Sequence, residues 1–97
     1  TEVMEWEVSF SIALIDGTNS QLEFQLFRTT YGTVLSPLAM GIKRSFNAET
    51  SSRWVTVYAK GVYPFFANYS FVPMLRRIGG STTEALVKDF TFYVRRL

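Results

Sequence analysis

The sequence contains neither cysteine nor histidine, and these two absences exclude much of the chemistry that small proteins use. Without cysteine there is no disulfide and no thiolate nucleophile, and without histidine there is no Ser-His-Asp relay and no imidazole base. Zinc sites built from these two residue types are excluded as well. We therefore predict that the protein is not an enzyme and has no cofactor, no metal site, no catalytic residues and no small-molecule substrate.

Long apolar runs are also missing. No segment approaches the ~20 apolar residues that span a bilayer, and no charged segment followed by an apolar one marks a signal peptide. Hydrophobic residues make up 47% of the 97 residues, which is enough for one core. We expect a single soluble domain, residues 1–97, with no membrane partner. Because the chain begins with Thr1 instead of Met, we expect a processed segment of a larger protein.

The net charge of +2 is distributed unevenly along the chain. Residues 1–27 carry five acids and no base, whereas residues 28–97 carry all ten bases and three acids, so the two parts have charges of −5 and +7. Opposite charges on neighbouring strands stabilise a sheet by roughly 0.2–1 kcal/mol per pair. We expect acidic strands to lie beside basic ones; the alternative is a dipolar surface that pairs copies head to tail.

The first 30 residues contain two stretches, 5–15 and 21–29, in which every second residue is apolar, the pattern of a half-buried strand. Between them lies a polar turn, residues 16–20, in which Gly17 can adopt a positive φ. We predict that the two strands form a β-hairpin. The first strand directs Trp6, Val8, Phe10, Ile12 and Leu14 to the core and Glu5, Glu7, Ser9 and Ser11 to the other face.

The same alternation predicts three further strands. Residues 53–63 form one, which ends where Pro64 has no N–H to donate. Residues 68–75 form another, and Pro73 within it suits an edge position. Residues 89–97 form a terminal strand.

Two short helices are predicted from capping signals. Ser36 and Pro37 suit the start of a helix over residues 37–46, although Gly41 disfavours it by about 1 kcal/mol relative to alanine, and an irregular crossover is the alternative. Ser81 and Glu84 match a capping box that opens a helix through Lys88. The fold class is therefore mainly β, a mostly antiparallel sandwich or barrel with one or two short helices. The alternative is an α+β fold with helices on one face of an antiparallel sheet.

Catalytic and phosphate-binding signals are weak. Glu5 and Glu7 lie on one strand face at a spacing that a glycosidase pair needs, but acids on a polar strand face are usually solvated. Gly79 and Gly80 lack the spacing and the lysine of a P-loop.

The segment 63–74 is dense in aromatic residues and predicts an interface. Contiguous apolar surface usually marks a partner site, and aromatic side chains are favoured at interface centres. The alternative is that these side chains close one end of the core. The candidate interface residues are Tyr63, Phe65, Phe66, Tyr69 and Phe71.

A second set combines aromatic rings with bases on the expected outer faces of two strands, as in a surface that stacks bases and binds phosphates. Its members are Trp54, Tyr58, Lys60, Tyr93 and Arg95. The alternative is that the Trp54 and Tyr58 rings pack beneath a helix or a second sheet. We predict a structural protein that associates with a protein partner or with itself, as a segment of a larger coat-like or oligomeric assembly. The second hypothesis is a small domain that binds single-stranded nucleic acid.

Overall fold

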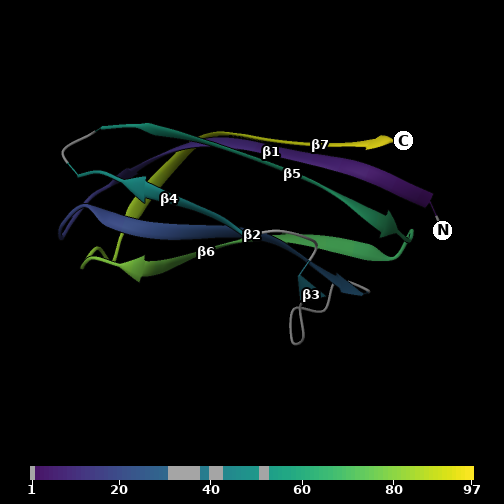
Figure 1. The fold of residues 1–97 in the computed structure, drawn as a ribbon, viewed down its shortest axis with the longest axis horizontal. Helices are drawn as coiled ribbons and strands as arrows, with labels where there is room; N and C mark the ends of the chain where they lie inside the picture. The colour runs from purple at the N-terminus through teal and green to yellow at the C-terminus, as the bar shows by residue number, and fades with distance from the viewer. Residues whose placement is uncertain (1, 31–37, 40–42, 51–52) are drawn as a thin grey trace.

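The computed structural model describes residues 2–30, 38–39, 43–50 and 53–97, and these contain strands and no helix. Two antiparallel sheets pack face to face (Figure 1), so the predicted mainly β, sandwich-like class is confirmed. Sheet A has the order β5–β1–β7, and sheet B is built around β2. The strands are β1 (Glu2–Leu14), β2 (Ser20–Thr30), β3 (Leu38–Ala39), β4 (Arg44–Ala48), β5 (Val55–Phe65), β6 (Tyr69–Gly79) and β7 (Ala85–Arg96).

In sheet B, β6 pairs along one edge of β2 from residue 21 to residue 30. The strands β3 and β4 pair with different stretches of β2, near its end and its beginning respectively, and share its other edge. Figure 1 shows β1, β5 and β7 together above β2 and β6.

The core lies between the two sheets and is built by the apolar face of each central strand. Alternate residues of β1 and β2 point into it because side chains on a strand alternate between faces. The rings of Phe10 and Phe24 meet across the sheets with centroids 5.4 Å apart. Full burial of each such side chain stabilises the fold by about 1.5–3 kcal/mol. The buried apolar residues of these strands and of β5 include Trp6, Val8, Phe10, Ile12, Leu14, Leu22, Phe24, Leu26, Val57 and Ala59.

The predicted hairpin of the first 30 residues is wrong. Both strands exist, but β1 lies in sheet A and β2 in sheet B, so they face one another across the core instead of pairing edge to edge. The connection between them carries the chain from one sheet to the other, and Gly17 in it has a φ of 72°. This arrangement buries the apolar faces of both strands against each other.

Neither predicted helix is present in the described residues. Within 37–46, Leu38–Ala39 forms β3 and Arg44 to Phe46 belong to β4, while residues 37 and 40–42 lie outside the described residues. Phe46 pairs with Leu22 of β2, and this non-local pairing overrides the local capping signal. The capping box is also wrong, because β7 begins at Ala85 and Thr18 donates its N–H to the Ser81 hydroxyl.

The predicted strand boundaries are partly wrong around the prolines. Pairing of β5 continues through Pro64, which lies opposite Val3, so Pro64 does not end the strand. The strand β6 runs on to Gly79 and pairs with β2 and with no other described strand, so the predicted edge position of Pro73 is confirmed.

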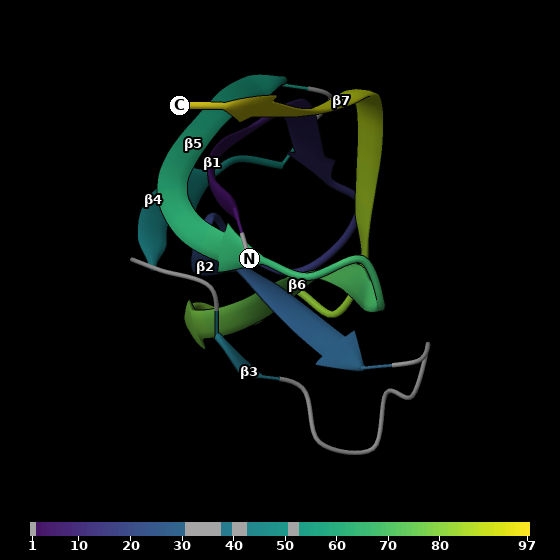
Figure 2. The same cartoon turned by 90° about the vertical axis from the view of Figure 1, so that its right-hand side faces the viewer.

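A β-bulge bends β7 near its middle. Thr91 pairs with Ser9, but Lys88 pairs with Ser11, so β7 contains one extra residue at this point. Asp89 at the bulge has a φ of 55°, in the left-handed region. Figure 2 shows the result: one half of β7 lies beside β1 and β5, and the other half turns toward β6.

Three acids of the central strands, Glu5, Glu7 and Glu23, pair with bases of the outer strands, so the expected internal charge complementarity is confirmed. Arg95 of β7 places its Nε 2.9 Å from a Glu5 carboxylate oxygen and also pairs with Glu7. In sheet B, Glu23 pairs with Arg76 at 2.8 Å. Such exposed pairs contribute about 0–1 kcal/mol each, so they select the pairing more than they stabilise it.

A polar cluster, which we call the loop clasp, joins the β1–β2 connection to the β6–β7 connection. The Asp16 carboxylate accepts hydrogen bonds from the Thr82 hydroxyl and from the backbone N–H groups of Thr83 and Glu84, at 2.9–3.0 Å. The Thr83 hydroxyl donates to it as well. These donors, those of Thr83 first, hold the pKa of Asp16 well below its usual value. A Cβ on Gly17 would lie 2.7 Å from the Thr82 backbone nitrogen, so only glycine permits this close approach.

Candidate interaction surfaces

The five residues of the nucleic-acid hypothesis gather on the outer face of sheet A. Lys60, Glu7 and Tyr93 form one row across the three strands, and Tyr58 and Arg95 lie in the neighbouring rows. Trp54 just precedes β5, and it, Tyr58 and Tyr93 are 39%, 47% and 62% exposed. Sequence alternation thus placed these side chains on one solvent-facing surface.

Acids run through the middle of this face, because β1 is the central strand of sheet A. Glu5 and Glu7 lie between the outer-strand residues, and both are paired with Arg95. The Lys88 ammonium lies 4.1 Å from the centroid of the Trp54 ring. The face offers flat rings and mixed charges, which suits stacking better than the tracking of a phosphate backbone.

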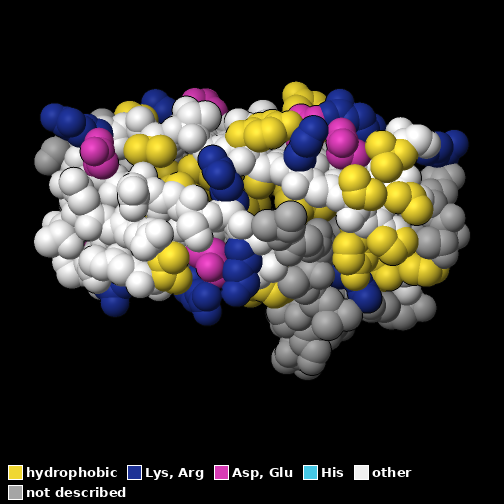
Figure 3. Space-filling view, viewed as in Figure 1, with side chains coloured by type: hydrophobic (Ala, Val, Ile, Leu, Met, Phe, Trp, Pro, Cys, Tyr) yellow, Lys and Arg dark blue, Asp and Glu magenta, His cyan; other side chains and the backbone are white. Residues whose placement is uncertain are grey.

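The aromatic segment lies at one end of the molecule, where apolar side chains gather over the end of β5 and the beginning of β6 (right-hand side of Figure 3). Tyr63 and Phe71 are half-buried against the core. The Phe71 ring lies 5.3 Å from the Phe92 ring, between centroids. Phe66 is exposed and meets Tyr69 edge to face at 5.2 Å, while the side chain of Phe65 lies outside the described part of the structure.

Arg28 of β2 organises this end of the molecule. Its Nε donates to the Tyr63 hydroxyl at 3.3 Å, and its guanidinium lies 4.2 Å from the centroid of the Tyr69 ring. The bond to Tyr63 raises the pKa of Arg28 above its usual value. Of the candidate interface residues, Tyr63 and Phe71 thus contact the core, whereas Phe66 faces solvent.

An apolar surface that the sequence did not indicate lies on the side of the sandwich between β6 and β7. Every residue of β7 except Phe92 is exposed, and so is β6 from Pro73 to Ile78. Val87 pairs with the fully buried Ile12 and so faces inward, yet it is 46% exposed because sheet B does not cover it. Alternation identifies the inner face of a strand, but it does not tell whether the opposite sheet is wide enough to cover that face.

A groove of about 210 Å³ opens on this side, and we call it the β6–β7 groove. Its floor is formed by Phe10 and Phe24 of the core, and Phe90 stacks on Phe10 with centroids 6.1 Å apart. The groove is predominantly apolar, and none of its described lining residues is titratable. Its lining residues are Phe10, Phe24, Pro73, Leu75, Val87 and Phe90.

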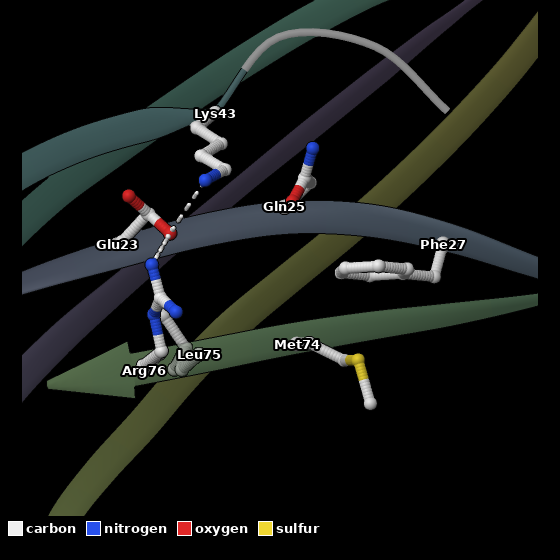
Figure 4. Close-up of a pocket in the computed structure, with 7 residues that line it drawn as sticks. All are labelled: Glu23, Gln25, Phe27, Lys43, Met74, Leu75 and Arg76. Atoms are coloured by element: carbon white, nitrogen blue, oxygen red, sulfur yellow. Dashed lines mark hydrogen bonds and ion pairs between the residues drawn. The ribbon is translucent and has the colours of Figure 1, made fainter. Parts of the chain in front are cut away.

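A larger hollow of about 550 Å³ lies on the outer face of sheet B (Figure 4). Glu23 is the one acid among its described lining residues, and it bridges Arg76 at 2.8 Å and Lys43 at 3.8 Å. Phe27 and Met74 line its apolar half. Since the carboxylate is paired with two cations, the described residues that line this hollow include no pair of groups arranged for acid and base catalysis.

Within the described residues, no three Asp or Glu side chains lie together in a way that could hold a metal ion. No helix that could cross a membrane occurs among them either. No known protein family matches the sequence, and no curated protein or solved structure is detectably similar to it.

Proposed function

We propose that this chain is a non-enzymatic protein–protein interaction module, a segment of a larger coat-like or oligomeric assembly, that associates through the β6–β7 groove. The observation that carries the proposal is the exposure of β6 and β7. They are long strands at sheet edges, and apolar side chains gather along them. Edge strands offer unpaired N–H and C=O groups, and uncovered apolar surface of this kind marks interaction sites.

The groove also supplies what an interface centre needs. Leu75 and Val87 are 42% and 46% exposed on opposite walls, and the rings of Phe10 and Phe24 lie between them. A partner side chain placed there would be removed from water on several sides. Anchors in such desolvated positions carry most of the binding energy of an interface.

The test is light scattering after size exclusion on the whole chain at high protein concentration and about 1 M salt, where charges more than ~3 Å apart are screened. We expect a mass above that of the 11.1 kDa monomer. Val87→Glu and Leu75→Glu, which place a charge in the groove, should each restore the monomer. A wild-type chain that stays monomeric under these conditions would count against the proposal.

Val62→Glu is the matched control. Val62 is 53% exposed on β5, at the edge of sheet A away from the groove, so a charge there should leave the association unchanged. If Val62→Glu dissociates the oligomer as strongly as Val87→Glu does, the groove is not the site and the proposal fails.

Binding of single-stranded nucleic acid is the second candidate function, and the gathering of Trp54, Tyr58 and Tyr93 on one exposed face favours it. The acids in the middle of that face oppose it. An oligonucleotide titration read by Trp fluorescence, repeated with Tyr93→Ser, tests it. Quenching that weakens with salt and with this substitution would support stacking on sheet A.

A further inference from the structure

The charges of the described strands are sorted by position in the sheets. The acids of the central strands β1 and β2 are all Glu, and β1 carries no base. The outer strands β5, β6 and β7 are basic, with Asp89 as their one acid. Their bases are Lys60, Arg76, Arg77, Lys88, Arg95 and Arg96.

This sorting disfavours pairing between two copies of the chain at these edges. An outer strand of one copy set against an outer strand of another would bring bases opposite bases, which destabilises a strand pair. Lysine and arginine on edge strands are a common means by which proteins avoid such edge-to-edge association. An edge protected in this way still accepts a strand of opposite charge.

The pairing of β7 with β1 shows which kind of strand β7 accepts. On the outer face, Glu5 and Glu7 of β1 meet Arg95. On the inner face, apolar residues of the two strands lie opposite one another, as Val8 does with Phe92. The stretch of β1 opposite the C-terminal half of β7 is thus acidic and apolar at alternating positions, whereas Lys88, nearer the groove, lies opposite Ser11. No described strand pairs with the second edge of β7, and its backbone runs alongside the β6–β7 groove.

We infer that β7 accepts, along this second edge, an extended segment of a partner protein that is acidic at alternate positions and apolar between them. The backbone of the segment would extend sheet A by one antiparallel or parallel strand, and one of its apolar side chains would fill the groove between Leu75 and Val87. Its acids would draw on Lys88, which lies nearest the groove in sequence and whose ammonium lies over the Trp54 ring in the unbound chain. The inference rests on the proposed function and names the chemistry of the partner.

The probe is a short synthetic peptide in which Glu alternates with Val around one central Phe. Since the chain has no cysteine, Ile78→Cys on β6, an exposed position three residues beyond Leu75, provides a single labelling site for an environment-sensitive fluorophore. We expect saturable binding that weakens roughly tenfold between about 0.1 M and about 1 M salt, as a few screened ion pairs predict. The same peptide with Lys in place of Glu should not bind.

Three variants locate the site. Val87→Glu should abolish binding, Lys88→Glu should weaken it several-fold, and Lys60→Glu on β5 should leave it unchanged. Binding that ignores Val87→Glu, or equal binding of the Lys peptide, would overturn the inference.

The two proposals fail separately. If wild-type chains associate at high salt through the groove but the acidic peptide does not bind at about 0.1 M salt, the inference is wrong and the proposed function stands. If neither association nor peptide binding occurs, both are wrong.

Discussion

Asp16 and Thr83 are joined twice, because the Asp16 carboxylate accepts hydrogen bonds from both the backbone N–H and the hydroxyl of Thr83. The two residues belong to different loops, and their contact fixes the connection of β1 and β2 to that of β6 and β7. Ser81 adds to it by accepting the Thr18 N–H at 3.0 Å. The loop clasp therefore holds the two sheets in place at one end of the sandwich.

The loop clasp predicts acid sensitivity. Because the pKa of Asp16 is lower in the folded chain than in the unfolded chain, its stabilisation is complete above the ordinary carboxyl pKa of ~3.9 and is lost as the pH falls from there toward the folded value. Asp16→Asn should lower the melting temperature at neutral pH and flatten its decline in acid. Melting temperatures measured from about pH 6 to about pH 2 test this. Asp89→Asn, which removes an exposed acid, is the control and should keep the wild-type dependence of melting temperature on pH. If the wild type, Asp16→Asn and Asp89→Asn all show the same dependence, the proposed role of Asp16 is refuted.

Gly61 is predicted to tolerate a side chain poorly because of Trp6. A Cβ at Gly61 would lie 2.7 Å from a ring carbon of the buried Trp6 indole, on the paired strand. Gly61→Ala should destabilise the fold by about 1–3 kcal/mol, the usual cost of overpacking. At Gly79 a Cβ would meet the Gln21 side chain at an ordinary 3.6 Å, so Gly79→Ala should cost much less. Urea unfolding followed by circular dichroism measures both, and equal losses would contradict the packing argument.

The bulge in β7 predicts that glycine at position 89 is more stabilising than a β-branched residue, the reverse of the usual preference in a strand. The left-handed backbone there costs roughly 1–2 kcal/mol for most L-residues and nothing for glycine. Asp89→Gly should therefore fold at least as stably as the wild type, whereas Asp89→Val should be less stable by about 1–2 kcal/mol. Thermal unfolding of the two variants gives the comparison. A valine variant as stable as the glycine variant would show that the bulge does not constrain this residue.

Removal of the Thr29 hydroxyl is predicted to stabilise the fold. Its side chain is buried in β2, and its hydroxyl has no hydrogen-bond partner among the described residues. An unsatisfied buried hydroxyl is costly, so the similarly shaped Thr29→Val should raise the free energy of unfolding by about 1 kcal/mol. Thr82→Val is the contrast, because the buried Thr82 hydroxyl donates to Asp16 and its loss should destabilise. Chemical denaturation that gives both variants the same sign would contradict this reasoning.

The strands could be predicted because alternation is a local property of the sequence. The residues of β1 that were expected in the core, such as Trp6 and Ile12, are buried there. Alternation says which face of a strand is apolar, but it does not say which strand lies beside it. This is why β1 and β2 were assigned to one hairpin although they belong to different sheets.

The false helices have a related cause. Capping signals at Ser36 and Ser81 are short-range patterns, and they hold only where no distant segment competes for the same groups. Phe46 instead pairs with Leu22, and the hydroxyl of Ser81 is taken by Thr18. Tertiary contacts override the helix signal in both regions, and the local sequence does not indicate these contacts.

The candidate surfaces divide in the same way. Alternation along β5 and β7 correctly predicted that Tyr58, Lys60, Tyr93 and Arg95 point outward. The acids that lie between these residues belong to β1, and they are there because β1 is the central strand of sheet A. The β6–β7 groove depends on how far one sheet extends over the other. That is a property of the assembled sandwich and of no single strand.

The position of β1 also constrains the order in which the molecule can form. Its partners are β5 and β7, which come later in the sequence. Ile12 can pair only once Val55 has been brought to it, and Met4 only once Arg96 has. Closing such long loops costs entropy before any contact repays it, and proteins dominated by distant pairings fold slowly. During synthesis both edges of β1 would stay unpaired until β5 and then β7 have been made. The topology therefore predicts slow folding, and it predicts that the edges of β1 need protection during synthesis.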